Sequence, residues 1–374
     1  MKIAMLGHKR IPSREGGVEI VVEELSKRLV KKGCLVTCYN RKGHHVSGDK
    51  YDQEKIDSYK GIEIKHVWTY EKKGLAALTS SFCAAIEAAF SNAEIIHIHA
   101  EGPAVMSFIP KLRGKRVIVT IHGLDWKREK WGKFASKYIK FGEKQAVRHA
   151  DEIIVLSKSV QDYFMSEYGR RTIYIPNGVS RPIIRENISI DKKWGLKKDN
   201  YVLYLGRIVP EKGIQYLLEA WKRIKTEKKL VIAGGASDTD EFYEKLRQSS
   251  SNVIWTGFVQ GEVLEELYSN AYIYCLPSDL EGMPLSLLEA MSYGNCCLVS
   301  NIDECVSVVE DKAVIFEKSN IVDLKNKLQD LLDNKEKVIN YKNMACEYIC
   351  NKYDWDRMAD ETMKVYKSEN FNNQ

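Results

Sequence analysis

The feature that most constrains the fold is a repeated alternation of short apolar runs with helical stretches. The runs in the first half of the 374-residue chain are KIAML, LVTCY, IEIKHV, IIHIH, RVIVTI, EIIVL and TIYI. Those in the second half are YVLYLG, KLVIAGG, NVIWTGF, AYIYCL, CCLVS and AVIF. Such alternation is typical of βαβ units, and strands that are apolar along their length are typical of parallel sheets covered on both faces. We therefore expect an α/β protein.

The length of the chain predicts more than one domain, because 374 residues exceed what a single hydrophobic core usually serves. A polar stretch, 177–200, interrupts the alternation and holds no strong helix, so we place the linker there. We expect two doubly wound α/β domains, over residues 1–180 and 190–354. Helices are expected between the later strands, at 214–225, 261–269 and 284–293.

Ligands of doubly wound sheets bind beyond the carboxyl ends of the strands, so the loops after the strands are informative. The sequence GRIVPEKG, from Gly206 to Gly213, follows one predicted strand and leads into a helix. Arg207 and Lys212 would lie near the helix N-terminus, where backbone N–H groups already favour an anion. Two cations at this position suggest an external anion as partner. The alternative is a solvated loop in which Glu211 pairs with one of them.

A second loop, DLEGMPLSLLEAMSYG, carries two glutamates eight residues apart. Glu281 lies in a turn to which Gly282 gives backbone freedom, and Pro284 suits the first position of a helix. Glu289 falls at the edge of the apolar face of that helix. A carboxylate at this edge either contacts a ligand or reaches solvent, and the segment alone does not distinguish the two.

The loop after the first strand, GHKRIPSREGGVEIVVEEL, is not a dinucleotide-binding motif, because GxGxxG is absent. Gly16 and Gly17 either let the backbone approach a ligand or form an ordinary flexible loop. Glu19 suits the first turn of the following helix electrostatically.

Three histidines lie in or just after predicted strands of the first half. His122, in HGLD, is either structural or part of a site. His97 and His99 alternate along one strand and would share a face, but without a third ligand they make a poor metal site.

Charge is distributed unevenly along the chain. Residues 1–185 contain 33 Lys and Arg against 20 Asp and Glu, which leaves 24 against 31 for the rest. A basic first half suggests an anionic surface or substrate. Within it, residues 126–149 interleave aromatic and basic side chains, as an interfacial helix on anionic lipid would. The alternative is a solvated helix that packs its aromatics on the domain. The aromatics are Trp126, Trp131, Phe134, Tyr138 and Phe141, and the basic residues are Lys127, Arg128, Lys130, Lys133, Lys137, Lys140, Lys144 and Arg148.

The nine cysteines form no CxxC pair, which favours buried reduced thiols over a metal site or disulfides. No run approaches the length of a membrane span, and the N-terminus has only a short apolar run before charged residues. These features predict a cytoplasmic protein, with possible peripheral contact to the inner face of the membrane through 126–149.

Together, GRIVPEKG, EGMPLSLLEAMSYG, the glycine-pair loop and the His after a mid-domain strand resemble the retaining nucleotide-sugar glycosyltransferases with the GT-B fold. The resemblance extends from Met1 to about Tyr366, and YDWDRMADETMKVYK is similar to the family's last helix, which crosses back to the first domain. Met283 departs from the pattern, since an aromatic residue is common there. The resemblance implies two Rossmann-like domains facing across a cleft, with a final helix over about 355–374.

The resemblance also implies a donor site. Arg207 and Lys212 would bind the diphosphate, Glu289 the ribose and Glu281 the sugar. His122 would come from the first, acceptor-binding domain and lie near the sugar. The catalytic residues implied are His122, Arg207, Lys212 and Glu281. The further donor-site positions implied are Gly17, Gly206, Phe258, Val259, Gly282, Met283, Pro284 and Leu285. Residues assigned to the acceptor side are Glu19, His99 and Glu101. No metal, cofactor or nucleic acid is implied.

The expected activity is retaining transfer of a hexose-type sugar from a nucleotide-diphosphate sugar, with UDP-sugar favoured. The expected acceptor is a saccharide or lipid-linked saccharide in bacterial surface polysaccharide, such as capsule, or glycolipid synthesis. The alternatives are a nucleotide-sugar epimerase or phosphorylase of the same architecture, and a non-catalytic nucleotide-sugar-binding protein.

Overall fold

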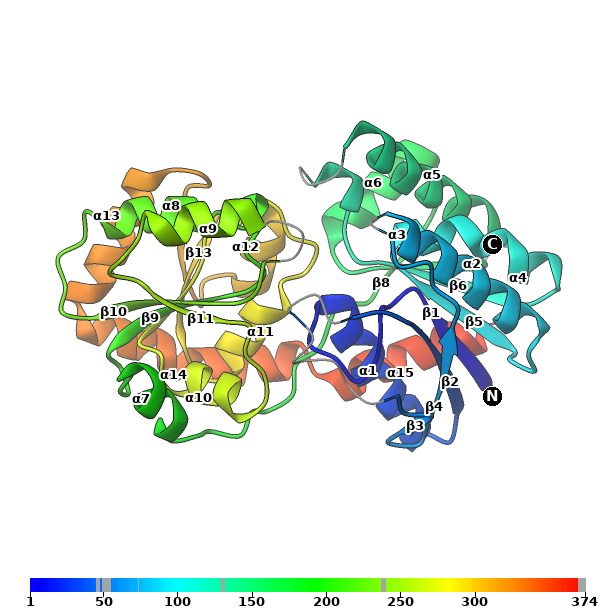
Figure 1. Cartoon of the computed structure of the whole chain (residues 1–374), viewed down its shortest axis with the longest axis horizontal. Helices are drawn as coiled ribbons and strands as arrows, with labels where there is room; N and C mark the ends of the chain where they lie inside the picture. The colour runs from blue at the N-terminus through cyan, green and yellow to red at the C-terminus, as the bar shows by residue number, and fades with distance from the viewer. Residues whose placement is uncertain (45–47, 49–54, 73, 129–131, 237–239, 369–374) are drawn as a thin grey trace. The chain divides into compact units, whose positions relative to one another are not determined.

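The computed structural model describes residues 1–44, 48, 55–72, 74–128, 132–236 and 240–368. The chain forms two compact units (Figure 1). The first unit comprises residues 1–177 and 355–374, and the second comprises residues 178–354.

The first unit is built on an eight-stranded sheet in the order β3-β4-β2-β1-β5-β6-β7-β8. Its pairings are parallel except for β3 with β4. Most residues of the long strands are buried, as apolar strands covered on both faces require. The strands are β1 (Lys2–Leu6), β2 (Leu35–Arg41), β3 (Ser58–Tyr59), β4 (Ile62–Val67), β5 (Ile95–His99), β6 (Arg116–Ile121), β7 (Glu152–Val155) and β8 (Ile173–Tyr174).

Helices cover both faces of this sheet, with α2 to α6 on one side and α1 and α15 on the other (Figure 1). The alanine-rich α2 buries Ala84, Ala85, Ala88 and Ala89, and of these Ala84 and Ala88 pack in the core cluster that contains the strand residues of the sheet. The helices are α1 (Gly17–Lys31), α2 (Leu75–Phe90), α3 (Glu101–Ala104), α4 (Phe108–Leu112), α5 (Lys133–His149), α6 (Lys158–Tyr168) and α15 (Trp355–Lys367), with 3-10 turns at Val105–Ser107 and Asp125–Lys127.

The second unit has a six-stranded, all-parallel sheet in the order β11-β10-β9-β12-β13-β14. Helices α8, α9 and α13 lie on one side of it, and α7, α10, α11 and α14 on the other (Figure 1). The strands are β9 (Tyr201–Leu205), β10 (Lys229–Ala233), β11 (Ile254–Gly257), β12 (Ile273–Leu276), β13 (Cys296–Ser300) and β14 (Val314–Phe316). The helices are α7 (Ile188–Trp194), α8 (Ile214–Trp221), α9 (Asp240–Gln248), α10 (Glu262–Asn270), α11 (Leu285–Ser292), α12 (Asp303–Val309), α13 (Ile321–Asp333) and α14 (Lys335–Lys352), with a 3-10 turn at Pro210–Lys212.

Helix α15 belongs to the first unit although it follows the second unit in sequence. Arg28 and Lys32, at the end of α1, form ion pairs with Asp356 and Asp360 of α15 at 2.8 and 2.6 Å. Tyr366 is buried against the sheet. The returning helix agrees with the resemblance, and the part of the predicted helix beyond residue 368 lies outside the described residues.

The structure differs from the sequence analysis at two places. Strand β3, a two-residue antiparallel partner of β4, was not predicted, because a run this short has no readable period. The stretch 177–200 contains α7, although we expect no strong helix there. Glu266 accepts hydrogen bonds from the N–H groups of Ser189 and Ile190, so a tertiary contact stabilises the start of this helix.

All nine cysteines are free, and seven of them are buried. Among the described residues, no helix combines the length and apolar character needed to cross a membrane.

Candidate active site

In the second unit the chain reverses its direction of winding between β9 and β12. Strands β10 and β11 lie on one side of β9, and β12 follows on the other. A doubly wound sheet binds ligands at such a switch point, beyond the carboxyl ends of its strands. The loop that leaves β9 there carries Arg207 and Lys212, and the loop that leaves β12 carries Glu281.

The loop after β9 is fixed by its backbone. Gly213 has φ of +66°, and a Cβ atom built on it would lie 1.8 Å from the carbonyl oxygen of Pro277. The Gly206 N–H donates to the Ala233 carbonyl at 3.0 Å, and the hydroxyl of Tyr204 donates to the Arg207 carbonyl at 2.9 Å. Gly213 is therefore required by both its conformation and its contact with the loop after β12.

Lys212 and Glu281 meet at this point. Lys212 Nζ lies 2.5 Å from Glu281 Oε1, and the hydroxyl of Ser278 donates to the same oxygen at 2.7 Å. The two side chains are only 15% and 7% exposed, so water screens the pair weakly. The glutamate thus holds the lysine ammonium at the strand ends.

Helix α11 presents Glu289 as the wheel predicts, at the half-buried edge of an apolar face. The hydroxyl of Tyr268 donates to Glu289 Oε2 at 3.1 Å, and the Tyr268 ring stacks on Tyr293. An aromatic pair therefore supports this carboxylate.

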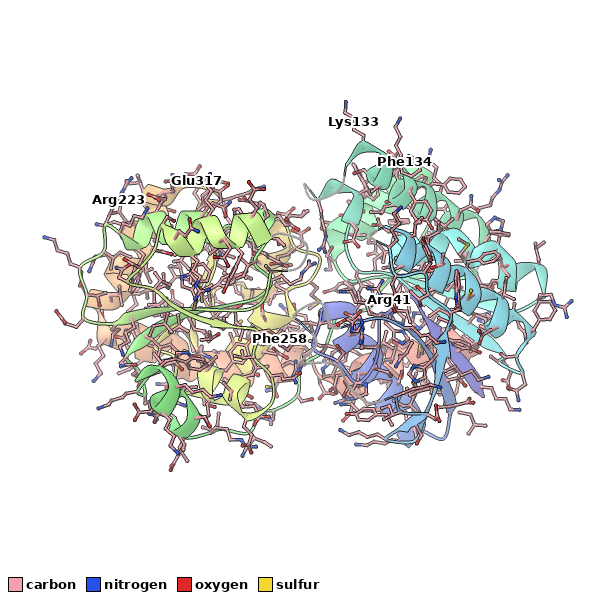
Figure 2. The ribbon with its side chains drawn as sticks, in the orientation of Figure 1. Arg41, Lys133, Phe134, Arg223, Phe258 and Glu317 are labelled. Carbon is pink, nitrogen blue, oxygen red and sulfur yellow. The ribbon has the colours of Figure 1, made fainter. Side chains whose placement is uncertain are left out.

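The turn before α11 differs from the expectation in two details. Pro284 is the N-cap residue, and Leu285 is the first residue of the helix. The φ angle of Gly282 is not positive, so the turn does not use the freedom of a glycine to adopt positive φ. Met283 is buried like Pro284 and Leu285, consistent with an apolar residue in this position. Phe258 and Val259 follow β11 and are partly exposed; Figure 2 labels Phe258.

In the first unit the switch point lies between β1 and β5. Gly7, directly after β1, has φ of +98°, and a Cβ atom there would lie 2.1 Å from the carbonyl oxygen of His99. His99 Nδ1 lies 3.1 Å from Nε2 of His122, which follows β6. The structure therefore brings together the two predicted histidines of this region.

Burial keeps these imidazoles neutral. It lowers the pKa of His122 to about 4, and nearby Asp125 and Glu19 offset part of that effect. It likewise lowers the pKa of His97 to about 3 and holds that of His99 well below its usual value. Near neutral pH, His122 can thus donate or accept a hydrogen bond but carries no charge.

Two buried glutamates support the loop after His122. Glu101 is 1% exposed, and its Oε2 accepts a hydrogen bond from the Asp125 N–H at 2.8 Å. Glu143 is fully buried and accepts from the indole N–H of Trp126 at 3.1 Å. Burial, followed by the proximity of Asp125 and Glu143, raises the pKa of Glu101 well above its usual value. The Glu101 carboxyl is therefore buried and bonded to the loop that follows His122.

The glycine pair lies at the start of α1, as its place in the sequence predicts. Gly17 is exposed and is the first residue of α1, preceded by Gly16 as N-cap. Glu19 is 5% exposed, and its Oε1 accepts a hydrogen bond from the Lys9 N–H at 2.9 Å. This local bond is sufficient to explain Glu19.

The basic aromatic stretch 126–149 is not one interfacial helix. Trp126 lies in a 3-10 turn and Tyr138 packs on a small apolar cluster, so both are turned inward. Phe134 and Phe141 are 85% and 49% exposed on α5. Figure 2 shows Phe134 with Lys133 at the outer end of that helix. The predicted residues Lys130 and Trp131, with Glu129, lie outside the described part of the chain.

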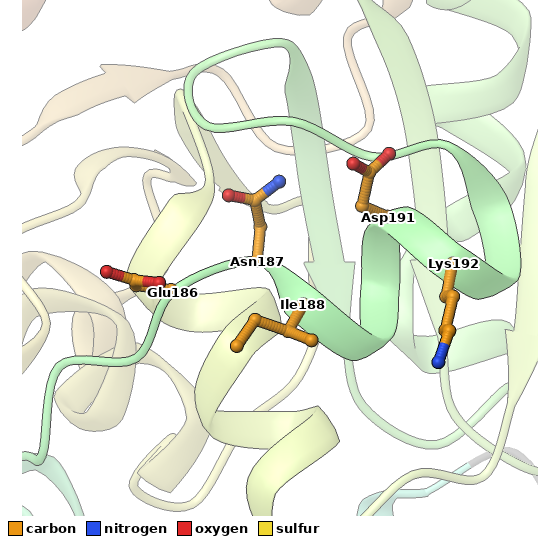
Figure 3. Close-up of a pocket in the computed structure, with 5 residues that line it drawn as sticks. All are labelled: Glu186, Asn187, Ile188, Asp191 and Lys192. Atoms are coloured by element: carbon orange, nitrogen blue, oxygen red, sulfur yellow. The ribbon is translucent and has the colours of Figure 1, made fainter.

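Within the described ranges, no group of three or more His, Cys, Asp or Glu side chains could hold a metal ion. A surface hollow of about 500 Å³ lies at the start of α7 (Figure 3). Its lining contains no candidate residue, so it lends them no support. The lining residues are Glu186, Asn187, Ile188, Asp191 and Lys192.

Sequence reasoning missed the residues that support the site. Ser278 and Tyr268 contact the two glutamates of the second unit, and Glu143 and Tyr366 lie far in sequence from the histidine region they support. Only Ser278, three residues before Glu281, carried a local signal. The others depend on long-range contacts that no spacing rule reveals.

Two family models match adjacent parts of the chain. Residues 15–181 match the model described as Glycosyltransferase Family 4, and residues 186–348 match Glycosyl transferases group 1. The chain belongs to the group 1 glycosyltransferases. Its two parallel α/β units are those of the GT-B fold that the resemblance implied.

Individual relatives of this glycosyltransferase are distant. Alpha-maltose-1-phosphate synthase of Mycolicibacterium smegmatis is 24% identical over 402 residues, covering 98% of this chain and 99% of that protein. The UDP-Gal:alpha-D-GlcNAc-diphosphoundecaprenol alpha-1,3-galactosyltransferase of Escherichia coli is 26% identical over 294 residues, covering 73% and 75%. The structure of Anabaena Alr3699/HepE with UDP and glucose matches with a TM-score of 0.81 at 16% identity, covering 99% and 100%.

The buried Glu101 carboxyl predicts a pH-dependent stability. An acid whose pKa is raised on folding destabilises the fold progressively as pH rises above its unfolded value, here about 4.5, because the unfolded chain releases the proton first. Glu101→Gln keeps an acceptor for the Asp125 N–H and removes the titration. We expect its Tm to exceed that of the wild type by a margin that grows as pH is raised from 5 toward neutrality.

The linkage slope is about 1.4 kcal/mol per pH unit, equivalent to a few degrees in Tm. Differential scanning calorimetry across that pH range measures the margin. Glu94→Gln, at an exposed position, is the control and should show none. A margin for Glu101→Gln that does not change with pH would contradict the raised pKa.

Proposed function

We propose that this glycosyltransferase moves a hexose-type sugar, with retention of configuration, from a UDP-sugar to a saccharide or lipid-linked saccharide acceptor. The name of one relative describes a UDP-sugar donor and a diphosphoundecaprenol-linked acceptor. One structural neighbour was solved with UDP and glucose. These likenesses favour a role in bacterial surface polysaccharide or glycolipid synthesis.

The observation that carries the proposal is the Lys212–Glu281 pair at the switch point of the second unit. The departing diphosphate gains charge as the sugar–phosphate bond breaks, and a preorganised cation lowers the energy of that state. Lys212 is held for this role before the donor binds, since Glu281 pairs with its ammonium group and Ser278 donates a hydrogen bond to that carboxylate. Arg207, from the same loop, supplies a second cation.

The rest of the donor is assigned to neighbouring groups of the second unit. Glu289 accepts hydrogen bonds from the ribose hydroxyls, and Glu281 binds hydroxyls of the sugar with the oxygen that Lys212 does not occupy. Backbone N–H groups near Met283 and Leu285 assist at the diphosphate. The base lies against Phe258 and Val259.

The proposed reaction requires no nucleophile from the protein. The bond from the sugar C1 to the phosphate oxygen breaks, and the acceptor hydroxyl oxygen forms the new bond on the face that the phosphate leaves. The hydroxyl proton passes to the departing phosphate. The first unit takes the acceptor, and the neutral His122 exchanges a hydrogen bond with a sugar hydroxyl.

An outer face of α5 suits an acceptor that resides in a membrane. Six exposed side chains fall in an arc of about 100° on the helix, while Ile139, Glu143 and Ala146 are buried. Aromatic and basic residues together favour the interface of an anionic bilayer. The six are Lys133, Phe134, Lys137, Phe141, Lys144 and Arg148.

A donor screen tests the activity itself. Thermal shift with a panel of UDP-, dTDP-, GDP- and ADP-sugars should give the largest rise in Tm with a UDP-hexose, and mass spectrometry should then detect transfer to acceptor saccharides. An epimer formed from the donor without any acceptor would instead establish the epimerase alternative and overturn the transferase.

With the donor so identified, Lys212→Ala should lower kcat by about 100- to 1,000-fold, as the loss of one preorganised charge contact does. Steady-state kinetics with wild-type enzyme as reference measures this. Lys222→Ala is the matched control, because Lys222 forms an exposed pair with Glu219 on the same unit and should leave kcat unchanged. Turnover of Lys212→Ala within twofold of wild type would refute the role.

Glu289→Ala should weaken UDP binding about tenfold, the equivalent of one or two hydrogen bonds to a charged group. Isothermal titration calorimetry measures the Kd. Glu262→Ala, at a side chain 72% exposed on α10, should bind UDP like the wild type. Equal affinity in Glu289→Ala and wild type would remove the ribose contact from the proposal.

For membrane docking, we expect the wild-type protein to cosediment with vesicles rich in phosphatidylglycerol and not with phosphatidylcholine vesicles. Lys137→Glu/Lys144→Glu should reduce binding at least tenfold, given about 1 kcal/mol for each basic residue near an anionic surface. Ile188→Ser, which removes an apolar side chain 67% exposed on α7, is the control and should bind normally. Binding that is the same for both lipids, or unaffected by the charge reversal, would exclude α5 as the docking face.

A further inference from the structure

Two neighbouring strands of the first unit carry polar side chains in a repeated diagonal arrangement. In the register of β5 with β6, His97 is opposite Ile118 and His99 is opposite Thr120. Each histidine reaches the residue two positions beyond its partner, so His97 bonds Thr120 and His99 bonds His122. Diagonal neighbours in a sheet are within reach of long side chains, and both contacts lie on the face that α15 covers.

The first of these two contacts, between His97 and Thr120, involves a histidine whose two ring nitrogens both have partners. His97 Nε2 lies 2.7 Å from the Thr120 hydroxyl, and its Nδ1 lies 2.6 Å from the hydroxyl of Tyr366 on α15. The His97 and His99 ring centroids are 4.2 Å apart. His99 therefore packs on a ring that cannot turn without breaking two buried hydrogen bonds.

The second contact, between His99 and His122, is also constrained by the backbone of His99. The His99 side chain is completely buried, and its carbonyl faces Gly7 at a distance that leaves no room for a Cβ atom. His99 Nδ1 lies 3.1 Å from His122 Nε2. Among the described residues the His122 ring makes no other hydrogen bond, so its Nδ1 is the ring nitrogen left for another partner.

Both imidazoles are neutral near neutral pH, because burial lowers the pKa of each. A neutral imidazole has one donor and one acceptor nitrogen. The hydrogen bond between the rings therefore couples their tautomers. If His99 donates, Nδ1 of His122 carries the proton. If His122 donates from Nε2, its Nδ1 is an acceptor.

We propose that His99 is a positioning residue. Its Nδ1 bonds Nε2 of His122, which fixes one tautomer and one ring orientation of His122 and leaves Nδ1 of His122 to meet the substrate. His99 cannot itself touch the substrate, since it is 0% exposed, whereas His122 is partly exposed. This replaces the acceptor-side role that the resemblance implied for His99. That the partner of Nδ1 is a sugar hydroxyl rests on the proposed function.

The test combines nitrogen NMR with kinetics on the full-length protein. In samples labelled with ¹⁵N-histidine, the shifts of the His122 ring nitrogens report which one carries the proton, and His122→Gln assigns them. We expect one dominant tautomer in wild type and a mixture in His99→Phe. His99→Asn, whose amide occupies about the position of Nδ1, should restore the dominant form.

The kinetic arm asks whether His99 acts through His122. His99→Phe should lower kcat about tenfold with donor KM nearly unchanged, the equivalent of one lost hydrogen bond in the transition state. In a His122→Ala background the same change should cost less than twofold, because its target is gone. Additive losses in the double variant would overturn the proposal.

Ser26→Ala is the matched control. It removes a fully buried hydroxyl of the same unit, whose partner is Cys38 rather than a histidine, so it should lower Tm while leaving the His122 tautomer and kcat unchanged. A His122 tautomer that is mixed in wild type, or unchanged in His99→Phe, would overturn the positioning role. The NMR result requires no substrate, so it stands or falls separately from the proposed transferase activity.

Discussion

Both candidate half-sites depend on a glycine that lies so close to neighbouring backbone that a Cβ atom would have no room. A Cβ atom built on Gly213 would lie 1.8 Å from the carbonyl oxygen of Pro277, and one built on Gly7 would lie 2.1 Å from the carbonyl oxygen of His99. Each contact joins loops that leave the two strands flanking a switch point. A larger residue at either position would push the two loops apart, and Lys212 would then lose Glu281, or His122 would lose His99. The precision of the side chains thus originates in two glycines packed against neighbouring backbone.

The two units stabilise their polar groups by opposite means. In the second unit Lys212 and Glu281 form an ion pair at low exposure. In the first unit the histidines and Glu101 are held in their uncharged forms by burial. A fixed charge suits a site for an anionic diphosphate, whereas neutral donors and acceptors suit hydroxyl groups. This contrast agrees with the division between donor and acceptor that we propose.

Much of the fold was predictable from the sequence, because thirteen apolar runs had the composition and spacing of buried strands, and each overlaps one of the strands found. The two-residue β3 and helix α7 were not, since a short strand has no period and α7 begins where Glu266 caps it from another helix. Arg207, Lys212, Glu281 and Glu289 could be selected because they follow strands or lie near the start of a helix. Their supporting partners could not: Tyr366 is 269 residues from His97, and only the folded chain brings them together.

Helix α15 has a consequence for the order in which the protein can be completed during synthesis. Its residues are translated after the whole second unit, yet Tyr366 completes the hydrogen bonds of His97 on the central sheet of the first unit. Until then, the face of that sheet beside α1 is uncovered, and His97 lacks one of its two partners. A ribosome-bound chain that has finished both sheets therefore still carries an unfinished histidine region. The first unit to be translated is the last to reach its final structure.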